Sequence, residues 1–393
     1  MLNQQLRKMR LAKGWSLEEL GAELGGVVTK QALSKYEHGK SVPSPKILNR
    51  LAVAFGVKSV YLIEENPIKV EFFGFRKRSD LRVAEENQIK SKVDLGLQQR
   101  VKISELLNDQ VQGVPIREYI IKTLEDAEDS AESLRKKWKL GLDPISNVVD
   151  VLEDNSIHVI EIEANERFDG LSAVAYGAKN EIKAAAVIVK RTHVGERQRL
   201  NLSHELGHLV TSVKQEDNKF IEKVAFRFGA AFLAPRQVVF KEVGKKRTDL
   251  TVEEMLILKK KFGMSMQALL YRLKDLDIIS QAYYTSCFRD VISRGWRKDE
   301  PATLKPEKSD LFNQQILRAF SEGLIDKSYA EELVNQKIPH KEDLSLLSFR
   351  ALMRLSIKER RRILEQQSEN MLSSYKKSND EREGWDGGDF TKY

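Results

Sequence analysis

The octapeptide Leu202-Ser203-His204-Glu205-Leu206-Gly207-His208-Leu209 decides how this chain is interpreted. Residues four apart on a helix lie on the same face, so the two histidine imidazoles can reach one metal ion. Glu205 lies to one side of them, where its carboxylate can accept a proton from water activated at that metal. The stretch therefore predicts a helix with two metal ligands and a general base. The alternative is a buried helix whose histidines hydrogen bond to core carbonyls.

A third ligand is predicted fourteen residues after His208, where Glu222 precedes an apolar segment that ends at Pro235. Helical spacing places Glu222, Ala225 and Gly229 on one face, so small residues line the face that bears the carboxylate. Such a face can pack closely against the histidine helix and bring Glu222 to the metal. The alternative is that Glu222 is an ordinary first-turn acid, which the helix dipole favours.

The motifs His-Glu-Leu-Gly-His at 204–208 and Glu-x-x-Ala-x-x-Phe-x-Ala-x-x-Leu-x-Pro at 222–235 resemble those of the ImmA/IrrE metallopeptidases. The resemblance implies that His204, His208 and Glu222 are metal ligands and that Glu205 is the general base. It also implies zinc as the cofactor, with another divalent metal such as Mn²⁺ left open. The implied substrates are helix-turn-helix repressors.

This resemblance extends from about Ala131 to about Arg272 and departs from the family pattern at two positions. Ala234 stands where Met is usual before the closing proline, and Phe226 stands where many members have Asn. Neither residue is expected to touch a ligand.

The first sixth of the chain is basic. Residues 1–62 carry ten Lys or Arg against four acidic residues, a net charge of +6 within a chain of formal charge +8. Such an asymmetry points to a polyanionic partner. The alternative is a basic surface that serves only solubility, so the residue pattern must decide.

The pattern in this region is that of short capped helices. Gly14 stops the first helix, and Ser16-Leu-Glu-Glu19 is a capping box for the second. Thr29 caps a third helix, and Ser44-Pro45 begins a fourth, with proline at the first helical position. The stretch Leu33-Ser-Lys-Tyr-Glu-His-Gly39 and its flanking spacing resemble the XRE-type (lambda-repressor-like) helix-turn-helix.

This second resemblance implies that the third helix enters the major groove of double-stranded DNA. The predicted DNA-binding residues are its outward side chains: Lys30, Gln31, Ser34 and Lys35. Leu17 stands where the family commonly has Gln, which removes a polar group often used at the DNA backbone. The alternative is a helix-turn-helix that serves only as a dimer module. A homodimer fits both interpretations, since dimers are the usual DNA-binding form.

The remainder predicts an α+β fold with an all-α helix-turn-helix head and a mainly helical zincin-like domain. Residues 64–80 break the periodicity and are interpreted as a linker, and helices are expected over 81–108, 116–140 and 250–279. Alternating apolar residues predict a small three-stranded sheet, with strands at 157–162, 171–176 and 184–190.

The sequence predicts four regions along the chain. They are a helix-turn-helix domain over 1–63, a helical connector over 64–125, the metallopeptidase domain over 126–285 and a helical C-terminal region over 300–393. His158 and His193 lie in or near the sheet and are expected to be structural or surface histidines. Arg197, Arg199 and Asn201 are interpreted as turn residues before the histidine helix that can orient substrate.

The end of the chain combines a basic amphipathic helix with three aromatics among Gly and Asp, namely Trp385, Phe390 and Tyr393. Exposed terminal aromatics are good anchors for a partner. The stretch is similar to the tails of some bacterial antitoxins, which implies a toxin partner bound by this C-terminal tail. The alternative is a tail that folds back on its own body.

The sequence excludes several classes of protein. No apolar run reaches membrane length, no signal peptide opens the chain, and the single Cys287 excludes an internal disulfide framework. A cytoplasmic location is therefore expected.

The expected function is a DNA-binding transcriptional regulator with metal-dependent endopeptidase activity. The competing interpretation is a non-enzymatic DNA-binding antitoxin or repressor with a structural metal site. Glu205 favours the enzyme, because a purely structural site needs no base.

Overall fold

A computed structural model of the chain describes residues 2–63, 68–77, 82–109, 113–165, 168–192, 194–214, 217–297, 299–338, 355–365 and 368. The chain divides into two compact units, Met1–Leu324 and Ile325–Tyr393. The described part of the second unit contains α16 (Lys327–Val334), which Asp326 caps. The aromatic tail with Trp385, Phe390 and Tyr393 lies outside the described residues. The toxin partner therefore stays a prediction.

The first unit begins with five short helices around a core of their own. They are α1 (Leu2–Lys13), α2 (Leu17–Glu23), α3 (Lys30–Glu37), α4 (Pro45–Phe55) and α5 (Ser59–Ile63). The predicted caps of three of them are confirmed. Ser16 forms a capping box with Glu19, Thr29 accepts a hydrogen bond from Ala32, and Ser44 precedes Pro45.

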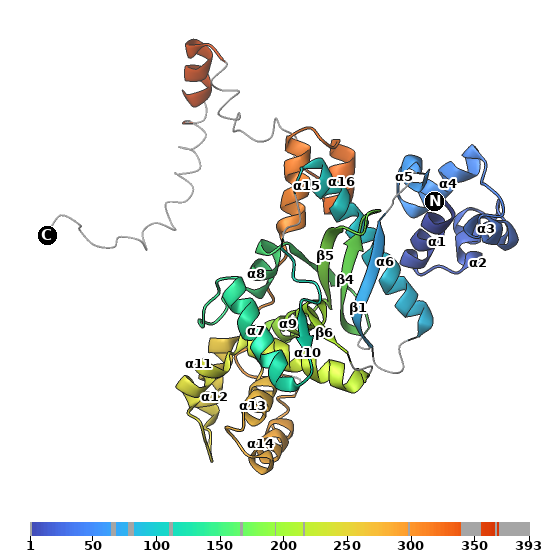
Figure 1. Ribbon diagram of the computed structural model, residues 1–393. Coiled ribbons are helices and arrows are strands. Elements are labelled where there is room, and N and C mark those ends of the chain that lie inside the picture. The colour runs from blue at the N-terminus through green and yellow to red at the C-terminus, as the bar shows by residue number, and fades with distance from the viewer. Residues whose placement is uncertain are drawn as a thin grey trace. The chain divides into compact units, whose positions relative to one another are not determined.

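The next element is a four-stranded sheet with the order β1-β4-β5-β3. Its strands are β1 (Lys69–Lys77), β3 (Ile157–Ile162), β4 (Phe168–Tyr176) and β5 (Ile182–Lys190). β4 pairs antiparallel with both β1 and β5, whereas β3 and β5 are parallel. Figure 1 shows β1, in blue, beside the green β4, although about ninety residues separate them in the sequence.

Two predictions about this sheet are wrong. The expected linker over 64–80 contains β1, and the sheet therefore has four strands among the described residues instead of three. The side chains of β1 alternate between the two faces of the sheet, which becomes clear only when the core on each face is known. Val70 and Phe72 pack on one core of the unit, and Phe73 belongs to the other. Gly74 then interrupts the pattern, which is why the sequence suggested a break.

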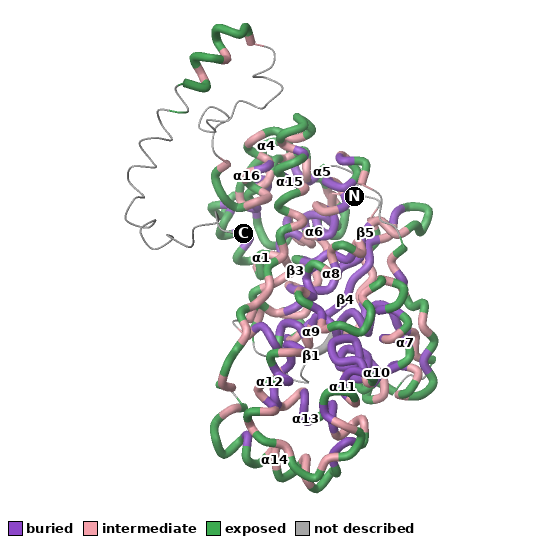
Figure 2. Tube along the Cα trace, turned by 90° about the vertical axis from the view of Figure 1, so that its left-hand side faces the viewer, coloured by how far each residue is buried: buried purple, intermediate pink, exposed green. Residues whose placement is uncertain are grey.

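Helices cover both faces of the sheet. One face packs against α6 (Val83–Leu106), so this helix belongs to the sheet layer and is more than a connector. The other face packs against helices that surround the main core: α7 (Leu124–Lys137), α8 (Val148–Asp154), α9 (Gly195–Val210) and α10 (Asn218–Leu233). Figure 2 shows most of α9 and the C-terminal half of α10 in the colour of buried residues. Among the five N-terminal helices, α1 packs against α6.

The rest of the unit surrounds this centre. A second, parallel pair is formed by β2 (Tyr119–Ile121) and β6 (Thr211–Val213). The remaining helices are α11 (Arg236–Val243), α12 (Val252–Phe262), α13 (Met266–Asp275), α14 (Gln281–Ser293) and α15 (Leu311–Ser321). The helical stretch expected over 250–279 contains two helices, because Gly263 adopts a left-handed φ of 62° and ends α12. Residues 300–324, expected in the C-terminal region, belong to the first unit.

Within the described ranges, every helix is either too short or too polar to cross a lipid bilayer.

Candidate metal centre

The candidate centre lies where α9 and α10 pack side by side at the middle of the first unit (Figure 1). The predicted small-residue face of α10 is what lets the two helices approach. A Cβ on Gly229 would lie 2.9 Å from the backbone nitrogen of His204, a distance that real Cβ atoms essentially never show. A larger residue would therefore push α10 away from the histidines.

This close packing brings the three predicted ligands together. The Nε2 atoms of His204 and His208 are 3.1 Å apart. The carboxylate of Glu222 lies 3.4 Å from His204 Nε2 through one oxygen and 3.3 Å from His208 Nε2 through the other. Among the described residues, this is the group of His, Cys, Asp and Glu side chains whose geometry can hold a metal ion.

These separations fit a small tetrahedral ion. Ligand atoms about 2.0–2.1 Å from a zinc ion in tetrahedral geometry lie about 3.3–3.4 Å from one another. The separation of 3.1 Å between the two Nε2 atoms is close to that value, and each imidazole lies 3.3–3.4 Å from a different oxygen of the Glu222 carboxylate. Two imidazoles and one carboxylate are also the ligand set of many catalytic zinc sites, which keep a fourth position open. The residues present therefore fit the group that the motif implies.

Burial is uneven around the centre. The side chain of His204 is fully buried and that of His208 is 4% exposed, whereas the Glu222 side chain is 37% exposed. The centre therefore opens to solvent on the α10 side. Burial raises the pKa of Glu222, but hydrogen bonds from the two histidines outweigh it and hold the pKa well below its usual range. Glu222 is therefore a carboxylate at neutral pH.

Glu205 lies next to the ligands, between α9 and the strand β4. It is 1% exposed. A Cβ on Gly170 of β4 would lie 2.5 Å from Glu205 Oε1, so the absence of a side chain there makes room for this carboxylate. The Ser172 hydroxyl, also on β4, donates a hydrogen bond of 2.5 Å to the Glu205 backbone carbonyl. Neither β4 residue was identified from the sequence, because Gly and Ser in a strand carry no site signal by themselves.

A second glycine approaches the centre from β1. Gly74 has a left-handed φ of 56°, and a Cβ on it would lie closer than 3.0 Å to three side-chain atoms of His208. The backbone of β1 therefore rests directly on a predicted metal ligand. The pairing of β1 with β4 is irregular between Phe73 and Arg76, so this contact falls at a β-bulge.

Phe226 corrects one expectation. Its ring lies 4.3 Å from the ring of His204, centroid to centroid, so this residue does touch a predicted ligand. It follows Ala225 on α10, and the close helix packing explains the contact. The Phe226 ring gives this imidazole an apolar neighbour.

The expected turn before the histidine helix is helical. Arg197, Arg199 and Asn201 all lie within α9, which begins at Gly195. Arg199 is 5% exposed, forms an ion pair with Glu307 and donates to the Ile145 carbonyl at 2.6 Å. It therefore ties the start of α9 to neighbouring segments.

A buried ion pair joins α13 to α7 near the end of α10. Arg272 on α13 and Glu128 on α7 are both fully buried, with a hydrogen bond of 2.6 Å from Nη1 to Oε2. Arg272 also donates to the carbonyl of Ala234, just after α10. Burial raises the pKa of Glu128, but Arg272 and Arg227 outweigh it and keep the pKa below its usual range. The family resemblance extends to Arg272, but nothing in the sequence indicated that Glu128 would be its partner.

The remaining histidines behave differently. His158 is buried in β3 and does not belong to the ligand group, in line with a structural role. Burial, together with the charge of Arg100, lowers its pKa to about 3. His193 lies outside the described residues.

The predicted DNA-contacting residues share the outer side of α3. Lys30, Gln31 and Lys35 are exposed and Ser34 is half-buried, while Leu33 faces the core. Lys30 forms an ion pair with Glu18 on α2. A buried ion pair of 2.6 Å between Arg10 and Glu37 holds α3 against α1. The helix thus presents a polar face on a rigid support.

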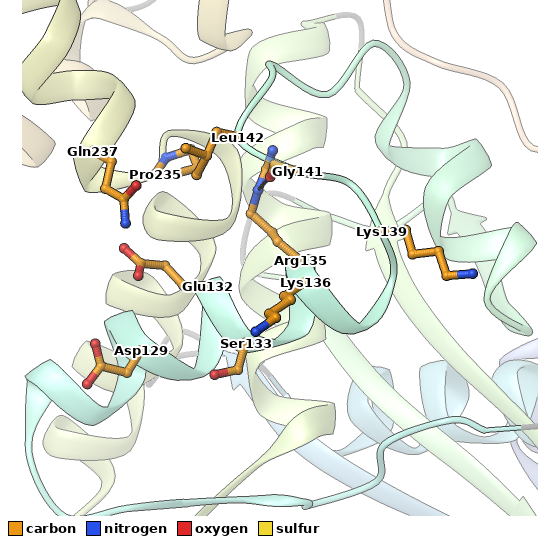
Figure 3. Close-up of a pocket in the computed structure, with 10 residues that line it drawn as sticks. All are labelled: Asp129, Glu132, Ser133, Arg135, Lys136, Lys139, Gly141, Leu142, Pro235 and Gln237. Carbon is orange, nitrogen blue, oxygen red and sulfur yellow. Dashed lines mark hydrogen bonds between the residues drawn. The ribbon is translucent and has the colours of Figure 1, made fainter.

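A pocket of about 700 Å³ lies away from this centre, along α7 and the start of α11 (Figure 3). Its lining mixes both charges, including Asp129, Glu132, Arg135 and Lys136. None of His204, Glu205, His208 and Glu222 lines it. The pocket is therefore separate from the metal centre.

Comparison with known proteins agrees with both resemblances. Residues 6–62 match the family model described as Helix-turn-helix, and residues 157–274 match the one described as IrrE N-terminal-like domain. The second match contains all four predicted residues of the metal centre. The two resemblances inferred from the motifs are thus confirmed.

The chain is also similar to the SPbeta prophage-derived uncharacterized HTH-type transcriptional regulator YonR of Bacillus subtilis (strain 168). The two are 36% identical over 64 residues, which is 16% of this chain and 57% of that regulator. The comparisons support a regulator that joins a DNA-binding helix-turn-helix to a metallopeptidase-like domain.

Proposed function

We propose that this protein is a DNA-binding regulator whose body is a zinc-dependent endopeptidase, with a helix-turn-helix repressor as its protein substrate. The observation that carries the proposal is the convergence of His204, His208 and Glu222 beside the buried carboxylate of Glu205. The substrate class follows from the ImmA/IrrE resemblance. Binding to DNA would place the activity in the cytoplasm, beside operator-bound repressors.

In this proposal each residue has a separate task. His204, His208 and Glu222 would hold the ion, which supplies Lewis-acid polarisation of the scissile carbonyl and lowers the pKa of water when bound. Glu205 accepts the proton of the attacking water and passes it to the leaving amine. The hydroxyl forms the new carboxylate and the proton completes the new amino terminus, so the peptide bond is hydrolysed without a further reactant.

The surroundings of Glu205 suit this role. Gly170 leaves space for the carboxylate, and the Ser172 hydroxyl is 3.5 Å from Glu205 Oε2. The base is thereby held at one place beside the ligands. A structural metal site needs none of these features, and it is usually closed by a fourth protein ligand.

The test compares the wild-type protein with Glu205→Gln, using metal-loaded protein and fluorescently labelled unfolded casein, followed by candidate repressors encoded nearby. We expect Glu205→Gln to retain the metal and to lose about 10²–10⁴-fold in cleavage rate, the usual contribution of a general base. Glu163→Gln, a change at an 81% exposed carboxylate, is the matched control. Equal cleavage by Glu205→Gln and wild type would refute the mechanism.

The competing function is a non-enzymatic antitoxin or repressor with a structural metal. That interpretation predicts no cleavage of any protein by either variant, together with unfolding when a chelator removes the metal. Metal analysis of the purified protein distinguishes zinc from manganese in either case.

A further inference from the structure

Strand β1 lies outside both regions that match known families, between residues 62 and 157, and joins the helix-turn-helix to the body. It stands at one end of the sheet order, with β4 as its neighbouring strand. Residues Lys69–Phe73 run antiparallel to Ser172–Tyr176 in regular register. β1 is therefore an added edge strand on the side of β4 that faces away from β5.

A peptide paired with this side of β4 would lie beside the metal centre, because Gly74 of β1 contacts His208 there. A scissile carbonyl has to come within reach of both Glu205 and the ligand atoms. β4 is the strand that contacts Glu205, through Gly170 and Ser172. An extended peptide that adds to this strand by main-chain hydrogen bonds therefore passes over α9 beside the Glu205 carboxylate.

β1 occupies that place in the structure. Phe73 pairs with Ser172, and Gly74, the next residue, rests on the side chain of His208. The regular register ends at this point. Arg76 pairs with Gly170, and a second register shift separates it from Lys77. The first irregular part of β1 therefore lies between the partners of Ser172 and Gly170, the β4 residues that contact the base.

We infer that β1 is an intramolecular occupant of the substrate position, so that a protein substrate gains access only when it displaces β1 from β4. This inference rests on the proposed peptidase function. It also describes the peptide that the site accepts. Phe73 is buried in the main core and Gly74 has no room for a Cβ, so the preferred segment is extended, with a large apolar residue followed by glycine.

The contacts of β1 are consistent with a strand that can be exchanged. Of the side chains described in β1, Lys69 to Gly74, Phe73 alone is buried. The guanidinium of Arg117 lies 4.6 Å from the Phe73 ring.

The other interpretation is that β1 is a permanent edge strand of the sheet, and that a substrate adds to the outer edge of β1. The two interpretations make opposite predictions about locking β1 in place.

The lock is a disulfide between β1 and β4. Glu71 lies directly opposite Val174, so Glu71→Cys with Val174→Cys can bridge the strands. The changes are made in a Cys287→Ser background, which removes the native cysteine. Reduction of the same protein releases the lock, so each sample is its own control. Glu71→Cys alone, treated identically, controls for oxidation.

Binding is measured first, without catalysis. The probe is a labelled peptide with the sequence of residues 68–77, added to full-length protein that also carries Glu205→Gln. We expect the oxidised protein to bind it at least tenfold more weakly than the reduced protein. Hydrogen exchange of the amides of residues 69–73 should rise when the peptide binds the reduced form. Equal binding in both forms, with slower exchange in β1, would establish β1 as a permanent edge strand and overturn the inference.

Cleavage is measured next with a fluorogenic version of the same peptide and the zinc-loaded protein that retains Glu205. The reduced form should cut it, and the oxidised form should lose at least tenfold in rate. Gly74→Val, whose Cβ cannot fit beside His208, should raise cleavage by displacing β1. Equal rates in both redox forms overturn the inference and leave the proposed function standing. No cleavage of this peptide or of casein by any variant rejects the proposed function, and the inference with it.

Discussion

Gly229 on α10 lies so close to His204 on α9 that a Cβ added to the glycine would stand 2.9 Å from the His204 backbone nitrogen. This contact sets the spacing of the two helices that carry the ligands. It explains why the Glu222 carboxylate, two turns earlier on α10, comes within 3.4 Å of both imidazoles.

The first prediction concerns this contact. Gly229→Ala should destabilise the metal-free protein by about 1–3 kcal/mol, because the neighbour is backbone and cannot move aside. Chemical denaturation measures the change. Gly96→Ala is the matched control in another helix, since a Cβ there would make only an ordinary contact of 3.5 Å. The control should be neutral or slightly stabilising. Equal effects of the two substitutions would remove the packing argument.

Removal of Glu222 tests the third ligand. Glu222→Ala should weaken zinc binding by about 100-fold or more, since even outer-shell changes cost about 10–100-fold. Competition with a zinc-chelating dye measures the affinity. Lys223→Ala alters the neighbouring exposed residue on the same helix and should leave the affinity unchanged. Undiminished affinity in Glu222→Ala would exclude this residue from the site.

The Glu128–Arg272 pair predicts a non-additive result. Arg272→Met leaves Glu128 buried with less compensation, which should cost about 3–5 kcal/mol of unfolding free energy. Adding Glu128→Leu should recover much of that loss, because the buried charge is gone. Denaturant unfolding of the two single variants and the double variant completes the cycle. Losses that simply add would show that the pair is not coupled.

His158 predicts a pH dependence of stability. Its pKa is about 3 in the folded chain and about 6.5 when unfolded, so the unfolded chain binds more protons between these values. Stability is fully present above pH 6.5 and falls as the pH is lowered, by about 2 kcal/mol from this residue between pH 7 and pH 5. His158→Gln should lack this component. Metal-free protein must be used, because metal binding itself depends on pH and would add to the change in stability. Parallel pH profiles of the two proteins would contradict the prediction.

The outer face of α3 predicts two distinguishable effects on DNA binding. Gln31→Ala should relax base preference at one position by about 1–3 kcal/mol. Lys35→Ala should weaken binding to all sequences and reduce the slope of log affinity against log salt by about 1. Binding titrations against a randomised operator library at several salt concentrations measure both. Lys139→Ala, an exposed lysine outside the head, should change neither. Salt-independent binding would refute the electrostatic part.

The sequence by itself determined the local chemistry of this protein. The i,i+4 histidines, the caps at Ser16, Thr29 and Ser44 and the small-residue face of α10 depend on interactions within one or two helical turns. Such interactions are written directly in residue spacing, so both family resemblances and the ligand set could be predicted.

Only the tertiary structure decided which distant segments meet. Arg272 finds Glu128 across 144 residues, Phe226 turns onto His204 through helix packing, and β1 is recognised as a strand by its pairing with β4. In β1 the alternation is short and Gly74 interrupts it, so its periodicity is too weak to identify a strand. Its place on His208 depends on long-range packing of backbone against a side chain, and no local pattern in the sequence records that contact.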